Sequence, residues 1–295
     1  MNKIAFKILV LVIVLFTTAC AKESDVEEDS STTLRLKRVN YTNSVGTLYR
    51  KYELQYSNDS VIYRADYNND TLRNTWVETS RTNYVYTKDS IILHNYILNQ
   101  NTNNWTLYYD SYYRLTNGKI TCFNQYYYNQ SAYLSSIYTF EYEGELLKRF
   151  KVSTNKYEYL YNNNTVAELK TYRYNYNLKK YTWQVSTTYK YANNLPSELL
   201  YCNIQNEKDT LPAYGKMIYQ YDANNNLKRY LYYRDETTNT LISYSSDEFL
   251  LKNGYLIQYS SSKGEKVTYE YEVGKGNISI FKDIAALFEF TPVPR

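Results

Sequence analysis

The chain has few of the residues on which most enzyme and metal sites depend. Its 295 residues include one histidine, three cysteines and eight glycines. The single histidine, His94, excludes sites with several histidine ligands and leaves no second histidine for a Ser-His-Asp triad. There is no Gly-rich phosphate loop and no cysteine pair with zinc spacing. We therefore predict no metal, no cofactor and no catalytic residue, with His94 in a structural or surface role on a strand.

The N-terminus lacks an apolar run long enough to cross a bilayer, which takes roughly 20 residues. Residues 8–16 form a short apolar run behind two lysines, followed by small residues and Cys20. This order is typical of a signal peptide over 1–19. The small residues and the cysteine resemble a bacterial lipobox, with Thr17 where a larger aliphatic residue is usual. The resemblance implies that Cys20 carries lipid and begins the mature protein; an ordinary cleaved signal peptide is the alternative.

Basic residues form no cluster. Removal of residues 1–19 takes away two lysines and no acidic residue, so 32 of the 34 basic residues remain against 30 acidic ones, a net charge of +2. This balance predicts no nucleic-acid partner. Acidic residues at 23–29 predict a solvated tether over 20–33. They also resemble the export tag of surface-exposed Bacteroidota lipoproteins, which implies a lipid anchor in the outer membrane and exposure at the surface; a plain hydrophilic spacer is the alternative.

Tyrosine is the most unusual component of the chain. There are 40 tyrosines against nine phenylalanines, and aromatic residues make up 18% of the sequence. Tyrosine favours half-buried, pleated strands, and its hydroxyl allows one end of the side chain to stay in water. Because helix-forming residues are scarce, the composition predicts an all-β protein.

A short unit recurs along the chain. Two anchors, aromatic or leucine, flank one polar residue and are followed by turn residues and an aliphatic residue, as in YQYDANNNL at 219–227. Successive second anchors are separated by 30, 29, 27, 19, 30, 30, 30 and 20 residues. They are Tyr56, Tyr86, Leu115, Tyr142, Tyr161, Tyr191, Tyr221, Leu251 and Tyr271. This period predicts a β-repeat domain over 34–281, followed by a capping segment at 282–295.

Each unit has the pattern of a β-hairpin. Aromatic residues alternate with polar ones at 138–143 and 172–176, which predicts aromatics on one sheet face and charges on the other. Asn-rich turns tolerate the positive φ of tight hairpins. We predict roughly 16 to 20 strands in an up-and-down antiparallel meander that forms an open or coiled sheet. In such a sheet Cys122 and Cys202 would lie about five strands apart, too far for a disulfide.

The three tryptophans follow the repeat. Trp76, Trp105 and Trp183 each come after a polar turn and before a Tyr-rich strand. Placement tied to the fold unit favours a recurring structural residue. The alternative is a platform on which the rings of a ligand such as a sugar stack.

The Tyr-x-Tyr-Asp-x-Asn-x-x-Leu pattern resembles the YD repeats of Rhs-type proteins. Over Cys20 and nearly all of 40–281 the chain is similar to Bacteroidota lipoproteins of unknown function built from such Tyr-rich repeats, and YEVGKGN at 271–277 resembles the ends of that group. The resemblance implies an architecture and no activity. True Rhs proteins have many more copies and a toxin tip, so a toxin-shell role is not implied.

These features predict a non-enzymatic cell-envelope lipoprotein whose repeat sheet binds a glycan or an envelope protein. The alternative is a secreted glycoside hydrolase, which needs only two carboxylates at a suitable separation. Candidates for that pair are Asp110, Glu141, Glu143, Asp222 and Asp247. An outer-membrane β-barrel is disfavoured, because neither face of the predicted strands has a continuous aliphatic band.

Overall fold

The computed structural model describes residues 34–129, 131–205, 209–235, 237–252 and 255–274. The predicted signal peptide, the tether with Cys20 and the capping segment lie outside these ranges. Every regular element within them is a strand, which confirms the all-β prediction. The described ranges contain no helix that is long and apolar enough to cross a membrane.

Nineteen strands are described. They are β1 (Leu34–Thr42), β2 (Leu48–Ser57), β3 (Ser60–Asp70), β4 (Thr75–Tyr86), β5 (Ser90–Asn99), β6 (Asn104–Thr116), β7 (Lys119–Asn129), β8 (Ser131–Glu143), β9 (Leu146–Val152), β10 (Asn155–Asn162), β11 (Thr165–Asn175), β12 (Lys180–Ala192), β13 (Leu195–Gln205), β14 (Asp209–Thr210), β15 (Gly215–Tyr221), β16 (Leu227–Arg234), β17 (Leu241–Lys252), β18 (Tyr255–Ser261) and β19 (Lys266–Val273).

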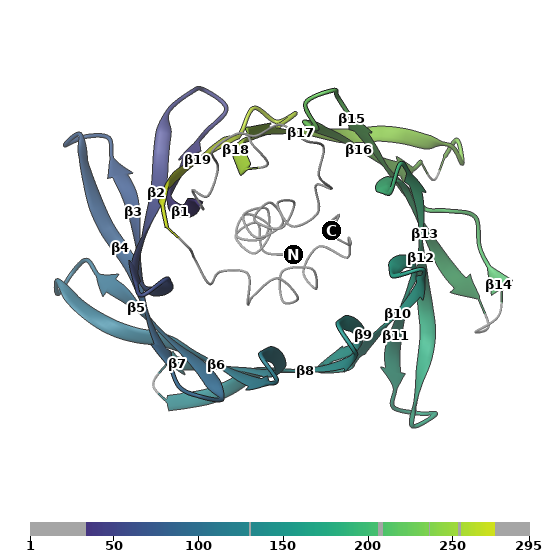
Figure 1. Ribbon diagram of the computed structural model, residues 1–295, viewed down its shortest axis with the longest axis horizontal. Coiled ribbons are helices and arrows are strands. Elements are labelled where there is room, and N and C mark those ends of the chain that lie inside the picture. Colours follow the sequence, from purple (N-terminus) through teal and green to yellow (C-terminus); the bar gives the residue numbers. More distant parts are fainter. Residues whose placement is uncertain (1–33, 130, 206–208, 236, 253–254, 275–295) are drawn as a thin grey trace, which may run out of the picture. The chain divides into compact units, whose positions relative to one another are not determined.

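The strands belong to two compact units. In the described chain the first unit comprises 34–135 and 250–274, and the second comprises 136–249. In the first, neighbouring strands pair antiparallel from β18 through β19 and β1 to β7 (Figure 1). In the second they pair from β8 to β13 and on through β15 to β17, with the two-residue β14 beside β13. The predicted up-and-down meander is confirmed.

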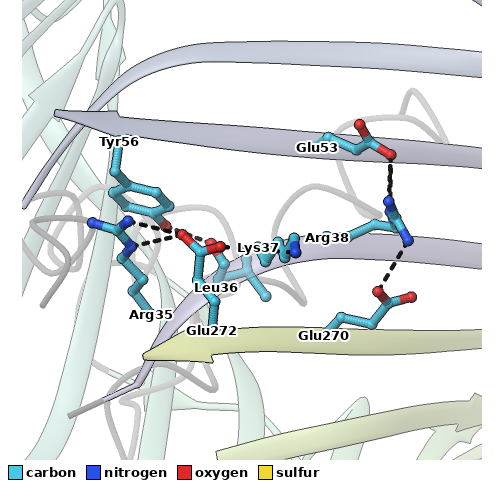
Figure 2. Close-up of polar contacts among 8 residues, drawn as sticks. All are labelled: Arg35, Leu36, Lys37, Arg38, Glu53, Tyr56, Glu270 and Glu272. Atoms are coloured by element: carbon cyan, nitrogen blue, oxygen red, sulfur yellow. Dashed lines mark hydrogen bonds and ion pairs between the residues drawn. The ribbon is translucent and has the colours of Figure 1, made fainter. Parts of the chain in front are cut away.

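The first and last strands are hydrogen-bonded to each other. β1 pairs with β19 from Leu34 opposite Val273 to Thr42 opposite Lys266. Figure 2 shows side chains along this pair: Arg38 lies between Glu53 of β2 and Glu270 of β19. The prediction of an open or coiled sheet is therefore wrong, because the meander closes through its terminal strands. Closure pairs the backbone N–H and C=O groups that two edge strands would leave free.

Tight asparagine turns join the strands at one end. Asn163 and Asn164 have φ of 48° and 66°, and Asn193 and Asn194 have φ of 51° and 63°. Two successive positive φ values define the hairpin turn that matches strand twist, and asparagine tolerates them better than most residues. The turn prediction from the Asn-rich segments is confirmed at these positions.

A tyrosine hydrogen bond repeats beside these turns. The hydroxyl of a second-anchor tyrosine donates to the backbone carbonyl of a residue 14 to 25 positions earlier in the chain. The pairs are Tyr56 to Leu36, Tyr86 to Val61, Tyr161 to Leu147, Tyr191 to Val166 and Tyr271 to Leu256, at 2.6 to 2.9 Å. The repeated anchor is thus a tyrosine because its ring is largely buried while its hydroxyl binds a backbone oxygen.

Side chains near the short turns separate into a buried face and a polar face. In the second unit Phe140, Phe150 and Tyr157 lie directly opposite one another on β8, β9 and β10, and the last two rings stack with centroids 4.1 Å apart. On the other face of the same strands, Arg149 pairs with both Glu141 and Glu158. The predicted separation of aromatics from charges is confirmed for β8 to β10. It fails where charged side chains lie on the buried face: Arg64 lies over the ring of Tyr52, and Arg229 pairs with the buried Asp247.

The separation fails at the other end of the strands, beyond a recurring β-bulge. One residue on the second strand of each long hairpin has no partner opposite, and these residues are Thr79, Tyr108, Gln184 and Tyr244. Beyond the bulge, Tyr172 and Tyr174 share the polar face with Lys170, because they occupy alternate positions of β11. The prediction of a single aromatic face is wrong there. On the opposing strand β12, the bulge at Gln184 also moves Trp183 and Tyr181 onto this face, opposite Tyr172 and Tyr174.

The cysteines Cys122 and Cys202 are both free thiols. Cys122 belongs to the first unit and Cys202 to the second, and the absence of a disulfide between them stays a prediction.

Candidate functional site

The polar face of the first unit carries a dense cluster of hydrogen-bonding side chains. We define this face by cross-strand partners: Lys51 faces Tyr67, Arg81 faces Tyr96, His94 faces Asp110 and Asp110 faces Tyr126. The face therefore extends over β2 to β7. Its side chains alternate with those of the buried face, as expected of a pleated sheet.

Asp110 is the centre of the cluster. Its side chain is only 5% exposed, and its carboxylate lies 2.7 Å from His94 Nδ1, 2.7 Å from the Tyr128 hydroxyl and 3.3 Å from the Tyr112 hydroxyl. A carboxylate oxygen accepts hydrogen bonds, so Nδ1 of His94 carries a proton. Three donors thus fix the orientation of one buried acid.

The carboxylate changes the titration of the tyrosines around it. Three causes raise the pKa of Tyr128 to about 12: its hydrogen bond to Asp110, desolvation of its hydroxyl and the negative charge of Asp110. Desolvation and the charge of Asp110 raise the pKa of Tyr112. Both hydroxyls remain protonated near neutral pH and can donate hydrogen bonds.

A cavity of about 780 Å³ lies beside this cluster. Its lining includes Tyr112, Tyr126 and Tyr128, together with Asn124 and Arg114. The rings of Tyr112 and Tyr126 meet edge to face with centroids 5.6 Å apart. Aromatic walls with a few convergent polar groups are typical of a site for a small polar ligand.

The candidate tryptophans lie on the polar face beyond the bulges. Trp76 on β4 is opposite Asn69, and Trp105 on β6 is opposite Leu98. Both are half-buried, and each follows a turn residue with positive φ by two positions. A cation lies over each ring: Lys51 Nζ is 5.0 Å from the centroid of Trp76, and the guanidinium carbon of Arg81 is 4.1 Å from that of Trp105.

Trp183 occupies a different position in the repeat. It lies on the second unit's β12 opposite Tyr172, whereas Tyr181 stands two residues after the positive-φ Lys179 and so corresponds to Trp76 and Trp105. The indole N–H of Trp183 donates to its own strand, at 3.0 Å from the carbonyl oxygen of Val185. Trp76 and Trp105 make no such bond with any described residue.

The acidic residues proposed for hydrolysis in the second unit all have local partners. Glu141 pairs with Arg149 at 2.7 Å, and Glu143 pairs with Lys148 at 2.7 Å. Asp247 is bound by the buried guanidinium of Arg229. Asp222 accepts backbone N–H groups inside its own turn, and the hydrogen bonds with Asn226 lower the pKa of Asp222. Within the described residues, each of these four carboxylates thus has its own hydrogen-bond or ion-pair partner, and no two of them share one.

Sequence reasoning singled out Asp110 but missed the tyrosines around it. The signal was the run of tyrosines at 126–128 on the strand that follows Asp110. Alternation places Tyr126 and Tyr128 on one face, and the register of β6 with β7 places Asp110 opposite Tyr126. The register cannot be read from the sequence, so the cluster becomes visible only in the structure.

Comparisons with known proteins give distant structural similarities only. No protein-family model matches the chain, and no curated protein is significantly similar to it. A protein of unknown function from Bacteroides fragilis is 14% identical, with 47% of this chain and 91% of that chain covered and a TM-score of 0.31. A DUF3836 family protein from Parabacteroides distasonis is 16% identical, with 30% and 84% covered and a TM-score of 0.25.

A porin-like protein from Bacteroides vulgatus matches a larger part of the chain. It is 9% identical, with 80% of this chain and 98% of that chain covered and a TM-score of 0.35.

Proposed function

We propose that the protein is a non-enzymatic cell-envelope lipoprotein, anchored in the outer membrane through Cys20 and exposed at the surface, that binds a glycan on the polar face of its first unit. The observation that carries the proposal is the cavity of about 780 Å³ with Tyr112, Tyr126, Tyr128, Asn124 and Arg114 in its lining. Sugars present hydroxyl groups and flat C–H surfaces together. Tyrosine rings match the C–H surfaces, while hydroxyl, amide and guanidinium groups match the hydroxyls.

The state of Asp110 supports binding over hydrolysis. A glycosidase needs one carboxyl group free to protonate the leaving oxygen and a second that activates water or attacks the sugar. Asp110 is buried, and its oxygens already accept hydrogen bonds from His94, Tyr112 and Tyr128. We assign it a positioning role, in which it holds the two tyrosine hydroxyls in the cavity wall.

The pairing of β1 with β19 favours a glycan over a protein partner that binds by strand addition. Strand addition requires an exposed strand edge. The first and last strands of the meander pair with each other and offer no such edge. A ligand that binds side chains on a sheet face is compatible with this topology.

The test is a glycan array probed with the mature chain purified in detergent, followed by calorimetric titration of each glycan that binds. Tyr126→Ala should weaken binding at least about ten-fold, equivalent to about 1.4 kcal/mol. Tyr176→Ala is the matched control, because Tyr176 is 71% exposed in a turn of the second unit. Absence of any glycan that binds, or release of new reducing ends from a bound glycan, would contradict the proposal.

A further inference from the structure

Two clusters of a cation and two aromatic rings repeat on the polar face of the first unit. Lys51 lies over Tyr67 and Trp76, and Arg81 lies over Tyr96 and Trp105. The cations are 30 residues apart in the chain, and the tryptophans are 29 apart. The two clusters are therefore the same site in successive repeats, displaced by two strands.

The register gives the displacement between the clusters. Lys51 is opposite Tyr67 on β3, whereas Arg81 is opposite Ala65, two residues before Tyr67 on the same strand. Two strand spacings and two residue rises correspond to about 9.6 Å across the strands and about 6.6 Å along them, or about 12 Å in all. This is the span of two to three hexose units in an extended β-linked chain.

The unused hydrogen-bonding groups of these clusters point to a polar ligand. Neither Trp76 nor Trp105 donates its indole N–H to a described residue, unlike Trp183, whose N–H binds Val185. Lys51 is neutralised by Glu53 at 3.0 Å. Arg81, in contrast, forms no ion pair with any described residue, so its guanidinium remains beside Trp105 as a donor for an anion.

We infer that an extended, β-linked acidic polysaccharide crosses β4 and β6 on this face. One sugar stacks on Trp76 and another on Trp105, each on the ring face away from the cation. Arg81 binds a sugar carboxylate beside Trp105, and the indole N–H groups donate to sugar oxygens. The inference rests on the proposed glycan-binding function and extends it to a second contact site and to a class of glycan.

The test uses two series of β-1,4-linked oligosaccharides, oligomannuronates as the acidic series and cello-oligosaccharides as the neutral one, each from two to eight units. Affinity for the full-length mature protein should rise at least about ten-fold, or about 1.4 kcal/mol, once the acidic chain reaches the three or four units that span both indoles. Trp76→Ala and Trp105→Ala should each abolish this rise. Trp183→Ala is the matched control and should leave it unchanged.

Arg81→Gln should remove the preference for the acidic series while leaving the weaker neutral binding in place. If the alanine variants are not folded by circular dichroism, Trp76→Phe and Trp105→Phe replace them, and fluorescence follows binding. An acidic hexamer should change the emission of the wild type and of Trp183→Phe but not that of the double variant Trp76→Phe, Trp105→Phe.

Three results would overturn the inference. One is an affinity that does not depend on chain length, the second is an equal loss in Trp183→Ala, and the third is a lack of binding by both series. If array glycans still bind and depend on Tyr126, the proposed function survives any of these results. If no glycan binds at all, both proposals fail.

Discussion

Arg38 on the first strand donates to Glu270 on the last strand, with Nη1 3.1 Å from Oε2, and the same guanidinium binds Glu53 at 2.8 Å (Figure 2). Residues more than 230 positions apart in the chain are thus neighbours in the sheet. The ion pairs are partly exposed and contribute at most about 1 kcal/mol. The backbone pairing of β1 with β19 closes the meander, and an engineered disulfide can test this pairing.

A disulfide should form across the seam between β1 and β19. Asn40 lies directly opposite Thr268. Opposed residues in an antiparallel pair have Cα atoms about 4.5 to 5.5 Å apart, within the range of a disulfide. In a background without other cysteines, Asn40→Cys with Thr268→Cys should therefore crosslink on oxidation, as seen by mass spectrometry of the digested protein.

The control for this crosslink is Asn40→Cys with Tyr269→Cys. Shifting the pair by one residue places the two side chains on opposite faces of the sheet. This control should not crosslink. Equal crosslinking of the two pairs, or none in either, would contradict the closed meander.

The repeated tyrosine hydrogen bond should have a measurable effect on stability. Tyr191 donates to the carbonyl of Val166 at 2.9 Å, and Tyr191→Phe should lower the free energy of unfolding by about 0.5 to 1.5 kcal/mol. Tyr221→Phe is the matched control, because the hydroxyl of Tyr221 is buried without a partner. Its removal should be neutral within about 0.5 kcal/mol or stabilising. Urea unfolding measures both, and an equal loss would argue against the hydrogen bond.

Alkaline pH should unfold the protein. Burial raises the pKa of Tyr191 to about 12, and burial together with a hydrogen bond to Glu78 raises the pKa of Tyr63 to about 12. The ordinary value in an unfolded chain is about 10. The folded state therefore holds these protons more tightly, and the stabilisation is complete below about pH 10 and is lost as pH rises towards 12.

The measurement is urea unfolding from pH 7 to 11.5, with tyrosinate absorbance recorded in parallel. Tyrosine ionisation should leave the free energy of unfolding unchanged up to about pH 9 and should lower it at higher pH. Complete titration of all tyrosines near pH 10 with the fold intact would contradict the assignment.

Lipid attachment at Cys20 remains a prediction from the sequence. Cys20→Ala should leave either an unprocessed precursor or a protein that no longer fractionates with membranes. Gel mobility and detergent partitioning distinguish these products from the wild type. Processing and membrane association that survive the substitution would show that Cys20 is not the anchor.

Much of the fold could be predicted because it is encoded locally. The alternation of aromatics and the asparagine turns define hairpins within about 30 residues, and the structure contains those hairpins with the predicted positive φ at Asn163, Asn164, Asn193 and Asn194. Closure could not be predicted in the same way. It depends on pairing between β1 and β19, and no turn or spacing in the sequence specifies a contact at that separation.

The bulges explain what was missed at the candidate site. A bulge residue, such as Thr79 or Tyr108, has no residue opposite it on the neighbouring strand. It leaves no signature in a pattern of alternating polar and aromatic residues. It nevertheless moves the rest of its strand to the other face. Trp76 and Trp105 therefore join Lys51 and Arg81 on the polar face, where alternation alone would place them on the buried one.

Glycan binding beside Asp110 is tested most directly by a crystal structure of the protein with the tightest-binding oligosaccharide from the array. We expect a sugar in the cavity beside Asp110, in contact with Tyr112, Tyr126 and Asn124. We also expect that Asp110 keeps its hydrogen bonds to His94 and Tyr128 and makes none to the sugar. A sugar bound elsewhere, with the cavity empty, or a sugar whose glycosidic oxygen lies against Asp110 would contradict this expectation.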